Sequence, residues 1–200
     1  MQRGSHRQRG VWRVHSPPVS IRLAIPAAAW LLASCAAPAV HLDPTDHVVR
    51  TETLQHRPLS YRVGPVPATW ESIAIPENDV AWHDRATDGV IHVDHSCAQD
   101  QDVPLPSLVQ HLLIGFTNRE VVSEETIPFD SREARHVVVR AQLDGVATLL
   151  ELYVMKKDGC VYDLGYVALP GRFEQGQANF TAFARGFSTV QTGLPSGGGT

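Results

Sequence analysis

The chain lacks the short motifs that commonly mark a catalytic site. It has no Gly-x-Ser-x-Gly turn, no glycine-rich phosphate loop, no Cys-x-x-Cys pair and no His-Glu-x-x-His zinc motif. Its N-terminal apolar run, Leu23 to Leu32, is interrupted by Pro26 and is shorter than the roughly 20 residues that a bilayer-spanning helix needs. These absences argue against the common enzyme classes and against a permanent membrane span in this run.

Cysteine and charge are also sparse. The 200 residues include three cysteines, 19% charged residues and 43% hydrophobic residues. This composition excludes a disordered, collagenous or disulfide-dense chain and suits one globular domain. The chain is too short for two independent domains of ordinary size once a targeting segment is removed.

Acidic residues are missing from residues 1–34, which contain five arginines ahead of the apolar run. This layout predicts a signal peptide; the alternative is a buried core helix behind a basic, disordered arm. Its removal would leave twelve Lys and Arg against 21 Asp and Glu, a net charge of −9. An acidic domain argues against nucleic acid and anionic lipid surfaces as electrostatic partners.

The apolar run ends in Leu32-Ala33-Ser34-Cys35, which resembles the lipobox of bacterial lipoproteins. The resemblance implies that Cys35 receives a diacylglyceryl group, that cleavage occurs just before it, and that the new amino terminus is acylated, as in palmitate-modified proteins. Two or three acyl chains give stable anchoring, whereas one is marginal. It also implies a bacterial cell-envelope location facing the periplasm. The residue after Cys35 is Ala36 and not Asp, which under enteric-type sorting favours passage to the outer membrane.

Two cysteines, Cys97 and Cys160, remain once Cys35 is assigned to lipid. Because thiols of an exported chain meet oxidising conditions, we predict a disulfide between them. A catalytic thiol is the alternative. It would need one cysteine beside a base, whereas Cys97 closes a strand-like run and Cys160 opens another.

The chain is expected to have four parts: a signal peptide over 1–34, a tether over 35–58, a globular domain over 59–190 and a flexible tail over 191–200. Three prolines and the absence of a sustained period mark the tether, and a run of glycines marks the tail.

Three Asp-Gly pairs, Asp88-Gly89, Asp144-Gly145 and Asp158-Gly159, predict hairpin turns between strands. A two-residue turn at the second pair places Leu143 opposite Val146 and gives one face that is apolar throughout. Successive hairpins of this kind predict an antiparallel meander.

The second hairpin has a polar face as well. It carries Arg140, Gln142 and Glu151, so a shift of one residue in the register would bury charge. These side chains are therefore expected to face solvent.

Apolar spacing of three and four residues predicts a helix over about 105–116, with Pro106 in its first turn, and a second from about Phe173 to Val190. Pro170 and Gly171 are expected to separate the second helix from the preceding strand. The predicted fold class is α+β, an antiparallel meander sheet with Asp-Gly hairpins, packed by an internal helix and a C-terminal helix.

The run from Gly165 to Leu169, followed by a helix that carries Phe180, Phe183 and Phe187, is similar to the PsbP-like fold. That fold also occurs in DcrB-type envelope lipoproteins and in a nuclear import factor. The resemblance covers about residues 59–190 and implies a binding or assembly module that is not an enzyme. We predict no cofactor.

Histidine and carboxylate side chains gather in the first predicted hairpin. With the turn at Asp88-Gly89, His83 is expected opposite Asp94 and Arg85 opposite His92, with all four side chains on one face. His83, His92 and Asp94 could converge on a metal. Arg85 would repel a cation there, and cross-strand His–carboxylate pairs are ordinary on solvent-facing sheets. We therefore predict no metal site.

Three functions follow from these observations. The first is a lipid-anchored envelope lipoprotein whose periplasmic domain is a non-catalytic binding or assembly module, with an envelope protein or lipid as partner. It predicts an exposed apolar patch around Trp70, Ile73, Ile75 and Trp82, for which core packing is the alternative. The second is a periplasmic enzyme or metal-binding protein that uses the histidine hairpin, which should then enclose a solvent pocket. A purely structural lipoprotein would show neither feature.

Overall fold

A computed structural model describes the chain over residues 41–43, 47–52, 58–76, 78–97 and 102–190. Contacts divide the chain into two units, residues 1–35 and residues 36–200. Every described residue belongs to the second unit. The predicted signal peptide, the predicted lipidation site and the predicted tail lie outside the described residues.

The described residues form eleven strands and two helices. In chain order they are β1 (His41–Leu42), β2 (Val48–Glu52), β3 (Pro58–Arg62), β4 (Trp70–Ile73), β5 (Val80–Asp84), β6 (Gly89–Ser96), α1 (Leu105–Leu112), β7 (Thr117–Phe129), β8 (Arg132–Leu143), β9 (Val146–Lys157), β10 (Cys160–Ala168), α2 (Pro170–Arg185) and β11 (Ser188–Thr189).

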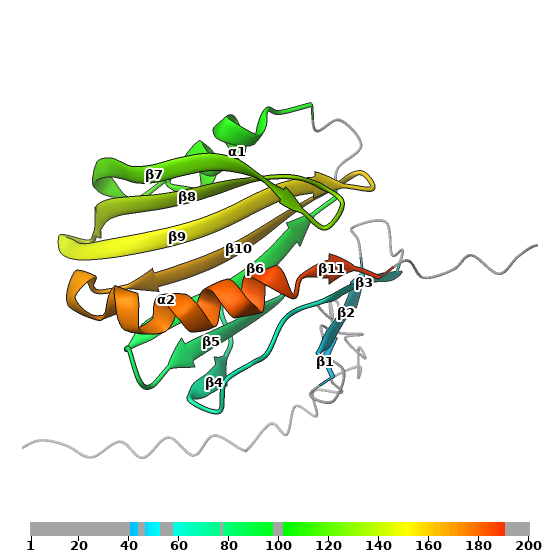
Figure 1. Cartoon of the computed structure of the whole chain (residues 1–200), viewed down its shortest axis with the longest axis horizontal. Coiled ribbons are helices and arrows are strands. Elements are labelled where there is room, and N and C mark those ends of the chain that lie inside the picture. Colours follow the sequence, from blue (N-terminus) through cyan, green and yellow to red (C-terminus); the bar gives the residue numbers. More distant parts are fainter. Residues whose placement is uncertain (1–40, 44–46, 53–57, 77, 98–101, 191–200) are drawn as a thin grey trace, which may run out of the picture. The chain divides into compact units, whose positions relative to one another are not determined.

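The strands form two antiparallel sheets. The larger has the order β4-β5-β6-β10-β9-β8-β7, and the smaller has the order β1-β2-β3-β11 (Figure 1). The meander of β7 to β10 follows α1 and returns the chain to the side of β6. The predicted α+β class with a meander-type antiparallel sheet is confirmed.

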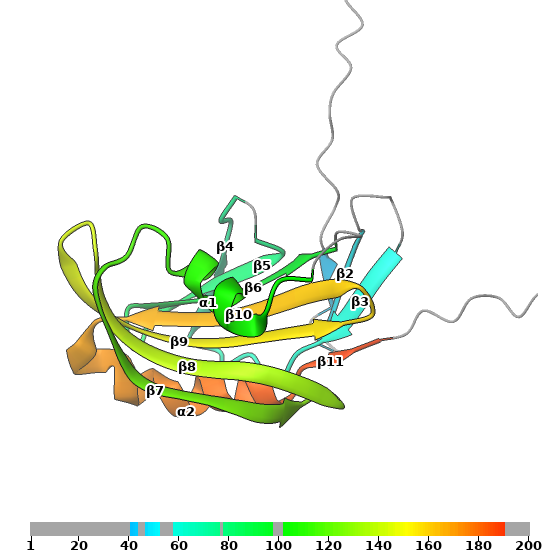
Figure 2. The same cartoon turned by 90° about the horizontal axis from the view of Figure 1, so that it is seen from above.

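The two helices lie on opposite faces of the larger sheet (Figure 2). Alternation along the strands supplies both faces with apolar side chains: Val137 and Val139 pack with Val109 of α1, while Ala134 and Val138 belong to the core on the α2 side. Neither helix among the described residues is long and apolar enough to cross a bilayer.

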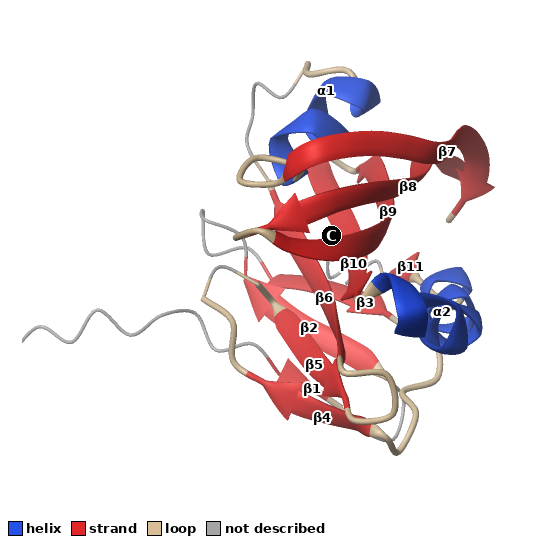
Figure 3. Cartoon of the chain, turned by 90° about the vertical axis from the view of Figure 1, so that its left-hand side faces the viewer, coloured by secondary structure: helices blue, strands red, loops and turns tan. Residues whose placement is uncertain are grey.

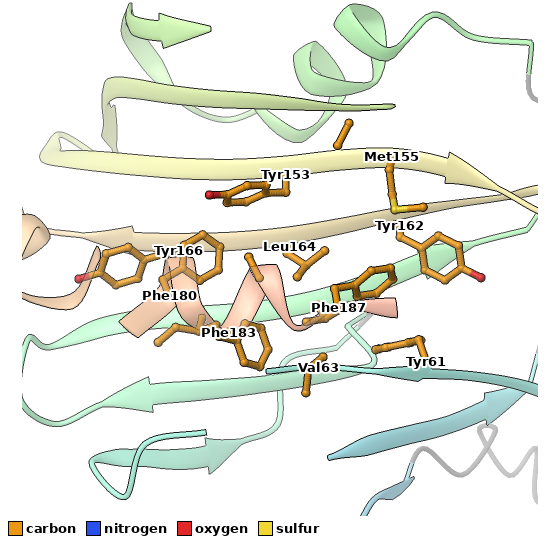
Figure 4. Close-up of a cluster of buried hydrophobic side chains, with 14 of the residues drawn as sticks. Tyr61, Val63, Tyr153, Met155, Tyr162, Leu164, Tyr166, Phe180, Phe183 and Phe187 are labelled. Atoms are coloured by element: carbon orange, nitrogen blue, oxygen red, sulfur yellow. The ribbon is translucent and has the colours of Figure 1, made fainter. Parts of the chain in front are cut away.

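The core on the α2 side is aromatic. Phe180 and Phe183 of α2 are fully buried, and Phe180 packs against Tyr153 and Tyr166 of the sheet (Figure 4). Buried aromatic side chains contribute much of the burial energy of a domain this size. The predicted aromatic face of the C-terminal helix therefore packs on the sheet.

The second and third hairpins have the predicted pairing. Leu143 pairs with Val146, and Lys157 pairs with Cys160. In these two turns both the aspartate and the glycine have positive φ, which a type I′ hairpin turn requires and which both residue types tolerate.

The first hairpin differs from its prediction, because Asp88 and Gly89 do not form a two-residue turn. Gly89 is the first residue of β6 and pairs with Asp84. The Asp84 carboxylate accepts hydrogen bonds from the Thr87 hydroxyl at 2.8 Å and the Ala86 amide at 3.1 Å. These bonds stabilise a longer turn, and the register of the hairpin changes accordingly.

The C-terminal helix begins and ends earlier than predicted. Pro170 lies in its first turn, where a missing amide proton costs nothing, and the helix ends at Arg185. Residues Ser188–Thr189 then pair with β3 as the short strand β11. The helix prediction up to Val190 was therefore wrong in its last residues.

Part of the predicted tether is folded. Strands β1 and β2 fall within residues 35–58, and β2 pairs with β3 across five residues on each strand. Val49 of β2 is fully buried against Tyr61 in the core. The ordered domain therefore begins before residue 59.

Candidate functional site

A cavity of about 450 Å³ lies beside α2, on the face of the larger sheet that this helix covers. In Figure 3 strands β7 and β8 lie above α2, at one end of the curved sheet. We call this cavity the α2 groove. Its lining consists of Glu125, Ile127, Pro128 and Phe129 of β7, His136 of β8, Glu151 and Tyr153 of β9, and Gln177, Thr181 and Arg185 of α2.

A chain of hydrogen bonds runs along the sheet side of the α2 groove. Nδ1 of His136 lies 3.0 Å from Oε1 of Glu125, and Nε2 lies 2.9 Å from Oε1 of Glu151. The Tyr153 hydroxyl donates to the same Glu151 oxygen at 3.1 Å. The ring of His136 stacks on Tyr153 with centroids 4.3 Å apart. One imidazole therefore joins two carboxylates.

Glu151 is the most unusual member of this chain, because it is a carboxylate that is only 1% exposed. Its Oε1 atom accepts two hydrogen bonds, whereas its Oε2 atom has no partner among the residues that the structure describes. A buried polar atom without a partner is costly, and such atoms in folded proteins usually have a specific explanation.

The hydrogen-bond partners of His136 favour its protonated form. Burial acts to lower the pKa of His136, but the hydrogen bonds with Glu151 and Glu125 outweigh it, so the pKa is raised. Burial and the nearby charge of Glu151 raise the pKa of Tyr153 far above its usual value. These shifts favour the protonated imidazole of His136 between two carboxylates and keep the neighbouring phenol of Tyr153 neutral.

Both ring nitrogens of His136 have partners within the α2 groove. A catalytic histidine needs a ring nitrogen that can exchange a proton with substrate, and both ring nitrogens of His136 contact glutamates. The unpaired oxygen of Glu151 can instead accept a hydrogen bond.

The histidine hairpin does not assemble as predicted. Nε2 of His83 lies 2.8 Å from the Asp88 carboxylate, whereas Nε2 of His92 lies 3.7 Å from that of Asp163. Asp94 pairs with Asp163 of β10 and not with His83. The altered turn at Asp84 causes this change. Neither the α2 groove nor the cavity over β4 and β5 is lined by His83 or His92.

A different set of potential ligands comes together at the other end of the same strands. Asp79, Asp94 and His95 place one oxygen or nitrogen atom each within 4.8 Å of one another. Nδ1 of His95 lies 2.7 Å from Asp79, which also accepts from the Tyr61 hydroxyl at 2.7 Å. Both bonds use the same oxygen of Asp79. The most unusual property of this group is the pKa of Asp94.

The surroundings of Asp94 disfavour the ionised form of its carboxyl group. Burial, followed by the charges of Asp163 and Asp79, raises the pKa of Asp94 to about 7. Since an aspartate ionises near pH 4 in the unfolded chain, Asp94 opposes folding as pH rises from about 4 to 7, and the full cost remains above pH 7.

We expect Asp94→Asn to stabilise the chain at pH 8 and to have little effect at pH 4. Allowing for solvent screening, the free energy of unfolding should rise by about 1–2 kcal/mol, which corresponds to about 3–6 °C in the melting temperature. Thermal unfolding followed by circular dichroism at both pH values would measure it. Asp144→Asn, at an exposed turn, is the matched control. Equal melting-temperature changes for Asp94→Asn at pH 4 and pH 8 would contradict the assignment.

The exposed patch predicted around two tryptophans is wrong for the tryptophans themselves. Trp70 and Trp82 are only 7% and 3% exposed, and both rings pack on Phe183. Ile73 and Ile75 are half-buried and line the cavity of about 510 Å³ over β4 and β5. Core packing therefore explains the tryptophans.

The predicted disulfide between Cys97 and Cys160 is present. Cys97 follows the last residue of β6, and Cys160 is the first residue of β10, which pairs with β6. Both half-cystines are buried, at 5% and 6% exposure. The bond therefore joins neighbouring strands inside the core.

The residues of the α2 groove were not singled out from the sequence. Glu151 was expected to face solvent together with Arg140 and Gln142. One signal was available, because Glu151 is the only charged residue in the strand before its last two lysines. A lone carboxylate in an apolar strand is rarely fully buried unless it has partners.

No family model matches the chain, and no curated protein is similar to it in sequence. Among solved structures, it is similar to LpqN, involved in cell envelope biogenesis of Mycobacterium tuberculosis, with 14% identity and a TM-score of 0.52 over 72% of this chain and 92% of that one. At this identity the similarity shows a shared fold alone.

Two further matches have lower TM-scores. Cyanobacterial PsbP from Synechocystis sp. PCC 6803 is 16% identical, with a TM-score of 0.49 over 82% of this chain and 99% of that one. A protein of unknown function from Pseudomonas aeruginosa is 12% identical, with a TM-score of 0.42 over 80% of this chain and all of that one.

Proposed function

We propose that the chain is a lipid-anchored lipoprotein of the bacterial cell envelope, whose folded domain is a non-catalytic module that binds another envelope component in the α2 groove. The observation that carries this proposal is the hydrogen-bonded chain through His136, which leaves an acceptor of Glu151 free but no free imidazole nitrogen. The similarity in fold to LpqN, a protein involved in cell envelope biogenesis, supports the location.

The anchor and the compartment are supported by the cysteines. Cys35 ends a lipobox-like sequence, and its thiol would carry the lipid. The Cys97–Cys160 disulfide fits a domain in an oxidising compartment such as the periplasm. Ala36 favours the outer membrane under enteric sorting, and the partner would be an envelope protein or lipid.

The intact mass of the protein recovered from the membrane fraction of its host tests the anchor. We expect the mass of residues 35–200 plus acyl chains, with two thiols that react with an alkylating agent only after reduction. Cys35→Ser should abolish acylation and processing while leaving the disulfide formed. An unprocessed wild-type chain with free thiols would contradict export and anchoring together.

A further inference from the structure

We infer that the α2 groove binds a zwitterion, whose ammonium group lies at Glu125 and Glu151 and whose anionic group lies at Arg185. This inference deepens the proposed binding role of the groove and rests on it. It follows from how charge and hydrogen-bonding capacity are divided between the two walls of the groove. The sheet wall is formed by the lining residues of β7, β8 and β9, and the helix wall is formed by those of α2.

The sheet wall needs hydrogen-bond donors. Oε2 of Glu151 is buried without a partner among the described residues, and Glu125, which is 61% exposed at the rim, shares His136 with it. Two carboxylates around one imidazole leave a net negative charge whether or not the ring is protonated. An ammonium group carries three donors and a positive charge, so it can satisfy both carboxylates.

The helix wall has the opposite requirement. Arg185 lines the α2 groove in the last turn of α2, and among the described residues no carboxylate lies within ion-pair distance of its guanidinium. Gln177 adds a side-chain amide donor to the same wall. A guanidinium with neighbouring donors is suited to a carboxylate or phosphate group.

Both walls together exclude the simpler ligands. A cation without an anionic group would leave Arg185 unpaired and would be repelled by it, whereas an anion alone would meet Glu125 and Glu151. A molecule with both charges is complementary to both walls. This chemistry occurs in the ethanolamine-phosphate headgroup of lipids and in free amino acids.

Calorimetric titration of the full chain carrying Cys35→Ser, held in detergent, tests the inference. The zwitterionic probes are O-phosphoethanolamine and glycine, and the single-charge controls are ethanolamine and inorganic phosphate. We expect at least one zwitterion to bind at least tenfold more tightly than either control. If neither zwitterion does so, the inference is wrong.

The same titration separates the two sources of the ligand. Tighter binding of monomeric dihexanoyl-phosphatidylethanolamine than of glycine would assign the groove to a lipid headgroup, and the reverse order would assign it to a free amino acid. Either order supports the inference. Anchoring of the protein is measured separately by its intact mass, so a failure here leaves that result standing.

Variants then locate the site. Glu125→Gln and Arg185→Gln should each weaken binding of the preferred zwitterion at least tenfold. The matched controls are Glu124→Gln, whose carboxylate bonds Arg135, and Arg172→Gln at the other end of α2; both should bind normally. Because Glu125 and Arg185 are exposed, these variants test the site even if Glu151→Gln does not fold. Unchanged affinity in both test variants would overturn the assignment.

Discussion

Loss of the Cys97–Cys160 disulfide is expected to lower the free energy of unfolding by about 4 kcal/mol. The bond closes a loop with a sequence separation of 63 residues, so it removes many conformations from the unfolded chain. An ordinary domain has a stability of about 5–15 kcal/mol. The disulfide would therefore supply a large share of the stability of this domain.

Urea unfolding of the full chain carrying Cys35→Ser, with and without a reductant, would measure this effect. The Cys35→Ser change leaves only the two disulfide cysteines, so any difference belongs to them. Adding Cys97→Ser and Cys160→Ser should reproduce the reduced curve and make it insensitive to reductant. A difference below about 1 kcal/mol would mean that the unfolded chain is not constrained by the bond as the loop model requires.

Local sequence determines much of the meander, and those parts could be predicted. The turn at Asp144-Gly145 and the alternation on either side of it fix the pairing of Leu143 with Val146. The first hairpin has an Asp-Gly pair too, but there the Asp84 side chain bonds its own turn and moves the register. A side-chain bond to a turn competes with the dipeptide signal, and the sequence alone does not show which one prevails.

The α2 groove could not be predicted because it depends on which face each helix covers. The alternation in β8 and β9 correctly separates Val139 from Glu151, but it does not indicate that α2 covers the side of Glu151. His136 and Glu151 meet because residues far apart in sequence are adjacent in the β8–β9 register. Such a contact needs the packed structure.

Backbone packing between distant segments is equally hidden. A Cβ atom on Gly186, just after α2, would lie 2.3 Å from the Gly64 Cα atom, and one on Gly64 would lie 2.4 Å from the Ala182 carbonyl oxygen. The Gly64 amide donates to the Phe183 carbonyl at 2.9 Å. This contact joins the segment after β3 to the end of α2.

Phe183→Ala should also be strongly destabilising, by about 3–5 kcal/mol. Phe183 is fully buried, and its ring centroid lies 5.2 Å from that of Trp70 and 5.4 Å from that of Trp82. Removing the ring would leave a cavity between α2, β4 and β5. The two indole rings pack on each other with centroids 6.0 Å apart, and close-packed interiors relax only in part, so the cavity is not expected to close fully.

Urea unfolding of Phe183→Ala, followed by tryptophan fluorescence, would report both the stability and the tryptophan environment. The expected result is an unfolding midpoint at lower urea together with a red shift of the native emission, since water gains access to Trp70 and Trp82. Gln175→Ala, on the exposed side of the same helix, should change the free energy of unfolding by less than about 0.5 kcal/mol.

A Phe183→Ala protein with native emission and a loss below about 1 kcal/mol, well under the usual cost of such a truncation, would show that α2 is not held through this ring. The α2 groove would then need a different anchor for its helix wall, because Phe183 lies in the same helix as Gln177, Thr181 and Arg185.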